Sequence, residues 1–145
     1  MRKAIAIAVT AALTLTSCQT LRDEKDRGFV SAAFTPHAPK VYVIGNKIVV
    51  DQEPVVFVGR GKIQVRWVLQ HPDYRFDGKS GITFEPKPVY GTPNQVVSCA
   101  VDSASDAAFT CENENSATGK YRYSITVVHR KTGLSLSYDP TFVND

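Results

Sequence analysis

The feature that most constrains the fold of this chain is an alternation of apolar and polar side chains with a period of two. It is clearest in residues 120–130, where the apolar face consists of Tyr121, Tyr123, Ile125 and Val127. Residues 63–70 repeat the alternation and place Trp67 on their apolar face. Such a pattern indicates β-strands with one buried face and one exposed face. Because no segment after residue 40 keeps a helical period over three turns, we expect an all-β domain.

Turn residues divide the rest of the chain into short strands. Gly45-Asn46 separates two apolar runs, 41–44 and 47–50, and is typical of a tight hairpin. The remaining predicted strands cover residues 55–58, 74–76, 82–84, 95–101, 107–112 and 134–138. Seven or eight short strands with frequent turns predict a single small antiparallel β-sandwich over residues 40–145.

The first residues of the chain resemble the export signal of a bacterial lipoprotein. Arg2 and Lys3 are positively charged, and the uncharged stretch 4–16 is shorter than the roughly 20 residues that a membrane-spanning helix needs. The tetrapeptide Leu15-Thr16-Ser17-Cys18 then matches the lipobox, which consists of an aliphatic residue, two small residues and a cysteine.

This resemblance implies that Cys18 is the site of lipidation. A diacylglycerol is attached to the thiol, the signal peptide of residues 1–17 is removed, and the new amine is usually acylated. Each buried methylene group contributes about 0.8 kcal/mol, so two or three acyl chains hold a protein on a membrane without a spanning helix. The alternatives are an uncleaved helix and an ordinary secretory signal with a chance cysteine.

The residues after Cys18 predict where the protein is anchored. In Gram-negative lipoproteins an aspartate at the next position favours retention in the inner membrane, and this chain has Gln19 there. The resemblance therefore implies the outer membrane, with the domain facing the periplasm. Residues 18–39 are expected to form the lipidated N-terminus and a flexible tether, because Pro36 and Pro39 disfavour regular structure.

The net charge of the chain comes mostly from the signal peptide. Removing Arg2 and Lys3 from the 17 basic residues leaves 15 against 14 acidic ones. A nearly neutral mature chain lacks the basic excess that is typical of nucleic-acid binding, so we expect no nucleic-acid partner.

With Cys18 set aside, two cysteines remain for a disulfide. Cys99 and Cys111 lie at equal distances on either side of Ser105, in the two arms of a predicted hairpin. The periplasm permits disulfides, and a cross-strand bridge is geometrically reasonable there. The alternative is a metal or redox pair, but such pairs usually have C-x-x-C spacing or nearby histidines. We therefore favour a structural disulfide.

The mature domain also resembles an immunoglobulin-like sandwich. Trp67 lies on an early strand and is followed by the cysteine pair, as in that architecture. The pair here lies within one hairpin, whereas immunoglobulin domains bridge two sheets across a longer interval. The resemblance is architectural and implies no function.

A search for catalytic or metal-binding motifs leaves few candidates. His37, His71 and His129 lack H-E-x-x-H spacing, and no G-x-S-x-G or S-x-x-K motif occurs. We interpret each histidine as an exposed residue in a loop or at a strand end. The cluster Glu112-Asn113-Glu114-Asn115 offers oxygen ligands for calcium but lacks EF-hand spacing, so we interpret it as an exposed loop. We expect no metal and no cofactor.

A possible binding surface follows from the outward faces of the strands. Arg66 and Arg122 lie on the polar faces of the two clearest strands and would form a basic stripe if those strands were neighbours. The alternative is an ordinary solvated sheet face that limits aggregation. Tyr90, in the loop between Pro86 and Pro93, is the tyrosine that we expect to be exposed.

Together these features predict a non-catalytic, lipid-anchored protein that binds a protein or another envelope component. One alternative is an inhibitor or immunity lipoprotein that inserts a loop, residues 77–81 or 102–106, into a cell-wall-degrading enzyme. The other is a hydrolase, which would require His71 or His129 to meet a serine and a carboxylate.

Overall fold

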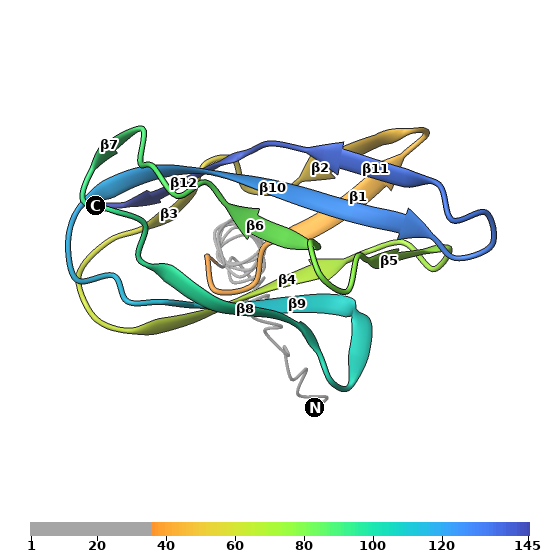
Figure 1. The fold of residues 1–145 in the computed structure, drawn as a ribbon, viewed down its shortest axis with the longest axis horizontal. Coiled ribbons are helices and arrows are strands. Elements are labelled where there is room, and N and C mark those ends of the chain that lie inside the picture. Colours follow the sequence, from red (N-terminus) through yellow and green to blue (C-terminus); the bar gives the residue numbers. More distant parts are fainter. Residues whose placement is uncertain (1–35) are drawn as a thin grey trace, which may run out of the picture. The chain divides into compact units, whose positions relative to one another are not determined.

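The computed structural model describes residues 36–145, which fold into two β-sheets packed face to face (Figure 1). No helix in this range is long and apolar enough to cross a membrane. In chain order the strands are β1 (Lys40–Ile44), β2 (Lys47–Val50), β3 (Val55–Phe57), β4 (Ile63–Leu69), β5 (Tyr74–Phe76), β6 (Ile82–Phe84), β7 (Tyr90–Gly91), β8 (Val96–Asp102), β9 (Ser105–Asn113), β10 (Gly119–His129), β11 (Ser135–Tyr138) and β12 (Thr141–Asn144).

The first sheet has the strand order β2-β1-β4-β9-β8. All its pairs are antiparallel except β1 and β4, which run parallel. The parallel pairing extends before β1, because the backbone N–H groups of Arg66 and Val68 donate to the carbonyl oxygens of His37 and Pro39 at 2.8 and 2.9 Å. The last residues of the predicted tether therefore lie along β4.

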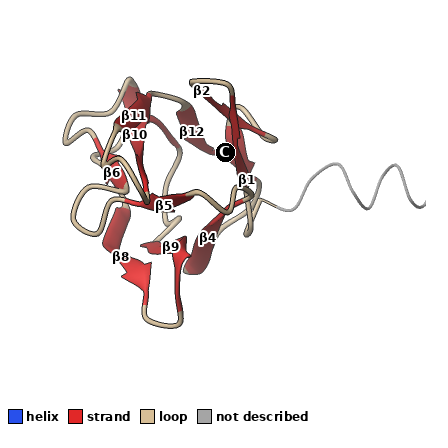
Figure 2. Cartoon of the chain, turned by 90° about the vertical axis from the view of Figure 1, so that its right-hand side faces the viewer, coloured by secondary structure: helices blue, strands red, loops and turns tan. Residues whose placement is uncertain are grey.

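The second sheet is built around β10, the longest strand of the described part of the chain (Figure 1). Along one side of β10 lie β11 and β12, and β3 continues the sheet by pairing in parallel with β12. Along its other side lie β5, β6 and β7 in turn. In the end-on view of Figure 2, β10 and β4 lie on opposite sides of the core.

Aromatic side chains fill the space between the sheets. Trp67 of the first sheet is fully buried, and the centroid of its indole lies 5.5 Å from the ring of Tyr123 in the second sheet. The other largest side chains with almost no exposed surface come from both sheets: Tyr121, Phe76, Phe109 and Phe142. Aromatic groups bury large apolar areas, so they contribute much of the hydrophobic stabilisation of this core.

The fold confirms the predicted all-β sandwich, and it confirms that Trp67, Tyr121 and Tyr123 are buried. The sheets differ from a purely antiparallel arrangement at the β1–β4 and β3–β12 pairs. Two strands, β7 and β12, were not predicted. Each is short, and the neighbouring prolines Pro93 and Pro140 made those segments look like loops.

Candidate functional site

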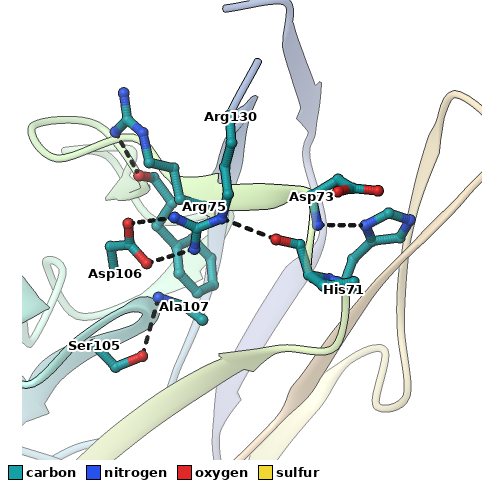
Figure 3. Close-up of polar contacts among 9 residues, drawn as sticks. His71, Asp73, Arg75, Ser105, Asp106, Ala107 and Arg130 are labelled. Carbon is teal, nitrogen blue, oxygen red and sulfur yellow. Dashed lines mark hydrogen bonds and ion pairs between the residues drawn. The ribbon is translucent and has the colours of Figure 1, made fainter. Parts of the chain in front are cut away.

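Arg130, which follows β10, is hydrogen-bonded to strand β9 and to the loop between β4 and β5 (Figure 3). Its Nη1 and Nη2 donate to the two carboxylate oxygens of Asp106 at 2.8 and 2.6 Å. Its Nε donates to the carbonyl oxygen of Pro72 at 2.9 Å. The backbone N–H of Arg130 donates to the carbonyl oxygen of Asp73 at 2.8 Å. A bidentate arginine–carboxylate pair fixes direction as well as distance. We call this arrangement the Arg130 clamp.

The Arg130 clamp connects elements of both sheets. Asp106 is the second residue of β9 in the first sheet, and the β8–β9 turn of residues 103–104 precedes that strand. Pro72 and Asp73 belong to the β4–β5 loop of residues 70–73, and Arg130 begins the β10–β11 loop of residues 130–134. We call these three segments the loop end. The hydrogen bonds from Arg130 hold the pKa of Asp106 below its ordinary value, so the pair is charged at neutral pH.

Two histidines meet at the loop end on the same tyrosine. The rings of His71 and His129 each pack edge-on against Tyr74, with centroid distances of 5.0 Å. The Nδ1 of His71 accepts from the backbone N–H of Asp73 at 3.2 Å (Figure 3), which leaves Nε2 to carry the proton of the neutral ring. The Nδ1 of His129 likewise accepts from the backbone N–H groups of Lys131 and Thr132, each at 3.2 Å.

The interpretation of these histidines as separate exposed residues was wrong. Both are half-buried, because Tyr74 lies between the β4–β5 loop and the end of β10 and offers its ring to each. Within residues 36–145 neither imidazole is hydrogen-bonded to a serine hydroxyl, the contact that the histidine–serine arrangement considered above would contain. The histidines act here as acceptors that hold loop backbone.

The two loops considered for an inhibitor are both ordered by aspartates. In the 77–81 loop, one carboxylate oxygen of Asp77 accepts from the backbone N–H groups of Lys79 and Ser80 and from the Ser80 hydroxyl, at 2.8 to 3.0 Å. In the 102–106 turn, Asp102 accepts from the backbone N–H of Ala104 at 2.9 Å. Short Asx turns of this kind restrict the loop backbone.

The basic stripe predicted from Arg66 and Arg122 does not form. Arg66 is on β4 of the first sheet and Arg122 is on β10 of the second, and these strands are not paired. The prediction failed because strand neighbours depend on pairing between distant segments. Arg66 instead pairs with Asp102, with its Nε 3.0 Å from the carboxylate oxygen Oδ2. Its charge is compensated within the first sheet.

Tyr90 and Arg122 do share a surface, the outer face of the second sheet. Tyr90 of β7 is paired in register with Lys120 of β10, and its side chain is 56% exposed. Arg122 lies two residues further along the same strand and is also exposed. The prediction that Tyr90 is exposed is therefore confirmed.

The cysteines predicted to pair do form a disulfide. Cys99 of β8 and Cys111 of β9 are bonded, with an S–S distance of 2.12 Å. Both strands belong to the first sheet, so the bridge joins the arms of one hairpin and does not connect the two sheets. Cys18, the predicted lipidation site, lies outside the described residues.

A buried cluster of amides was missed. Asn113 and Asn144 exchange two side-chain hydrogen bonds, at 2.8 and 3.1 Å, and neither side chain is exposed. Asn115 is also buried, and its side-chain amide donates to the carbonyl oxygen of Gly59 at 3.1 Å. The interpretation of residues 112–115 as an exposed loop was wrong, because β9 continues to Asn113 and alternation turns that residue inward.

The side chains of the described region form no metal-binding cluster. In residues 36–145 no group of three or more histidine, cysteine, aspartate or glutamate side chains is placed to hold an ion.

Comparison with known protein families finds no family that matches the sequence, and no curated protein matches it. The chemistry of the site therefore has to be judged from its own geometry.

Proposed function

We propose that this chain is a non-catalytic lipoprotein of the bacterial envelope whose loop end binds a protein or another envelope component. The lipobox at Leu15-Thr16-Ser17-Cys18 supports an anchor in the outer membrane, with the domain in the periplasm. The sandwich supports a binding role, since loops held by a rigid β-scaffold are common recognition surfaces. Trp67 between the sheets supports an immunoglobulin-like version of that scaffold.

The observation that carries the proposal is the Arg130 clamp. One guanidinium contacts two segments, through Asp106 and Pro72, that are far from it in sequence. Loops that are already fixed lose less conformational entropy when a partner binds, so a larger part of the contact energy contributes to affinity.

The loop end also offers contacts of more than one kind. Leu134 in the β10–β11 loop is 60% exposed and supplies an apolar contact. Lys131 of the same loop and Asp73 of the β4–β5 loop are exposed charged residues. An apolar contact with a polar surround is typical of protein interfaces.

An inhibitor of a cell-wall-degrading enzyme is the second candidate. It is favoured by the rigidity of the two loops considered above, since Asp77 accepts three hydrogen bonds and Asp106 is held by Arg130. A loop that enters an enzyme cleft must resist rearrangement, as preorganised inhibitors do. Assays of lysozyme and amidase activity with the purified protein test this candidate, and full enzyme activity at saturating protein rejects it.

The main proposal is tested by photo-crosslinking in living cells. A photoreactive amino acid replaces Ala104, at the exposed tip of the β8–β9 turn, or Gln64, exposed on β4 away from the loop end. We expect a discrete crosslinked product from position 104 and none from position 64. Equal products from both positions, or none from either, would reject the loop end as the binding surface.

A further inference from the structure

The outer face of the second sheet carries a row of side chains that crosses four strands. Residues paired in register run from Tyr90 on β7 through Lys120 on β10 and Val143 on β12 to Val56 on β3. We call this the Tyr90 row. Paired residues on neighbouring strands project to the same face, so the row forms one continuous surface.

Exposed apolar groups are concentrated around this row. Of the eight large apolar side chains that residues 36–145 expose, four lie on or beside β3 and β7: Val56, Val58, Val89 and Tyr90. They form two groups at the two ends of the row, and the half-buried Val143 lies between them. Single exposed apolar residues are ordinary, but two such groups joined along one row are typical of an interaction surface. Lys120 lies within the row and is half-buried, so its alkyl chain adds apolar area to the surface.

The same face carries charges of both signs that form no ion pair with another residue of the range 36–145. Arg122 is exposed beside the row, and the backbone N–H of Glu85 donates to its carbonyl oxygen at 3.0 Å. Because Phe84 points into the core, alternation turns Glu85 outward, next to Arg122. Among the described residues neither side chain takes part in an ion pair within 4.0 Å.

The outer face of the first sheet is different. There Arg66 pairs with Asp102 at 3.0 Å, and Lys62 pairs with Glu112 at 2.7 Å. Two outward cations of the first sheet are therefore compensated by carboxylates of the same sheet, whereas the second sheet leaves an arginine and a glutamate available beside the Tyr90 row.

We propose that the Tyr90 row binds a second copy of this chain across a twofold axis. A twofold interface brings a surface against itself, so it needs a patch that is self-complementary in shape and charge. The Tyr90 row meets its own copy, and Arg122 of each protomer faces Glu85 of its partner. An anionic membrane or an acidic polymer fits less well, because Glu85 and Asp139 balance the charges of Lys120 and Arg122 and leave this part of the face no positive excess.

The proposed dimer goes beyond the binding function assigned to the loop end and leaves that end open. Lys120 and Arg122 lie in the first half of β10, whereas Arg130 follows the other end of that strand. Both protomers would thus present a loop end, and a partner with repeated sites would bind two at once. Two linked contacts raise the overall affinity without any new contact.

The test uses charge reversal in the full-length protein, purified in a polyoxyethylene detergent and measured by native mass spectrometry. The wild-type protein should be dimeric. Arg122→Glu alone and Glu85→Arg alone each place like charges together across the axis, so each should weaken the dimer about tenfold or more. Mixing the two variants restores both opposite-charge pairs, and a heterodimer should then form.

The control is Arg66→Glu on the other sheet, which should leave the dimer unchanged. A monomeric wild-type protein would overturn the proposal, and so would variants that dimerise normally or a mixture that forms no heterodimer. None of these results bears on crosslinking at position 104, so the dimer and the loop-end function can fail separately.

Discussion

The indole Nε1 of Trp67 donates a hydrogen bond to the hydroxyl oxygen of Tyr123, 3.3 Å away, and this contact joins the two sheets inside the core. Both side chains are completely buried. Burial raises the pKa of Tyr123 well above its ordinary value, so the hydroxyl stays protonated and remains available as a partner.

Replacing Trp67 should destabilise the whole domain. Trp67→Ala removes the largest buried side chain and leaves a cavity, so we expect the free energy of unfolding to fall by about 3–5 kcal/mol. Chemical denaturation followed by tyrosine fluorescence measures this loss. A loss below about 1 kcal/mol would mean that the indole is not part of a close-packed core.

Tyr123→Phe tests the polar part of the same contact. The substitution keeps the ring but leaves the buried Trp67 N–H without its acceptor, which should cost about 1–3 kcal/mol. The matched control is Tyr90→Phe, since Tyr90 is exposed and its hydroxyl has no such role. Equal effects of the two substitutions on denaturation would contradict the account.

The bond between Cys99 and Cys111 should stabilise the domain chiefly by restricting the unfolded chain. The two residues are 12 apart in sequence, and closing a loop of this size contributes about 3 kcal/mol on the chain-entropy model. We expect peptide mapping without reductant to recover the two cysteines linked, and reduction to lower the melting temperature. Two free thiols in the exported protein would refute the pairing.

The amide pair of Asn113 and Asn144 should be sensitive to removal of either member. Asn144→Ala leaves a buried amide without its partner, so we expect a loss of about 1–3 kcal/mol in the free energy of unfolding. Gln64→Ala, at an exposed position, serves as the control. If both variants denature alike, the amide pair contributes nothing to stability.

Acid should loosen the loop end. The hydrogen bonds from Arg130 lower the pKa of Asp106, and a backbone hydrogen bond from Ala104, followed by one from Arg66, lowers the pKa of Asp102. A carboxyl group whose pKa is lower in the folded state stabilises the fold above its unfolded pKa, near 3.9, and the stabilisation is lost as the pH falls through the folded value.

The melting temperature should therefore stay level from pH 7 to about 5 and fall below about 4. Asp106→Asn should make that fall shallower, because one of the titrating groups is gone. Differential scanning calorimetry across this range measures the effect. Because an exposed pair contributes little to global stability, the pairing itself is checked by an NMR titration of the Asp106 carboxyl carbon. An Asp106 pKa that is not lowered in the folded protein would show that Arg130 does not hold this residue in solution.

The proposed anchor is tested by Cys18→Ala. Without the thiol no diacylglycerol can be attached, so the protein should leave the membrane fraction and lose incorporation of labelled palmitate. Continued labelling of the variant would reject the lipobox interpretation. The outcome of this assay does not depend on the structure of residues 36–145.

Local patterns were enough to predict much of the fold. Alternation identified β4 and β10 and placed Trp67 and Tyr123 in the core, and Gly45-Asn46 marked a hairpin whose glycine has a φ of 63°. The position of Asn113 was also readable, since it shares the phase of Cys111 and lies at the end of the same strand. Its polar side chain concealed that signal.

Contacts between segments that are far apart in the chain could not be predicted from the sequence. Nothing near Arg130 indicates that its partner is Asp106, and nothing near His71 indicates that it shares Tyr74 with His129. Arg66 and Arg122 were grouped because their strands look alike, but strand order depends on pairings across the whole chain. The candidate site consists of such long-range contacts, and so it emerged only from the structure.

The most direct test of the central claim compares crosslinking from position 104 in cells that carry wild-type Arg130 or Arg130→Gln. The variant loses the bidentate contact with Asp106 but keeps the fold, because an exposed ion pair contributes little to global stability. We predict a clear fall in the crosslinked product at equal protein level. An undiminished product would contradict the claim that the Arg130 clamp prepares the loop end for its partner.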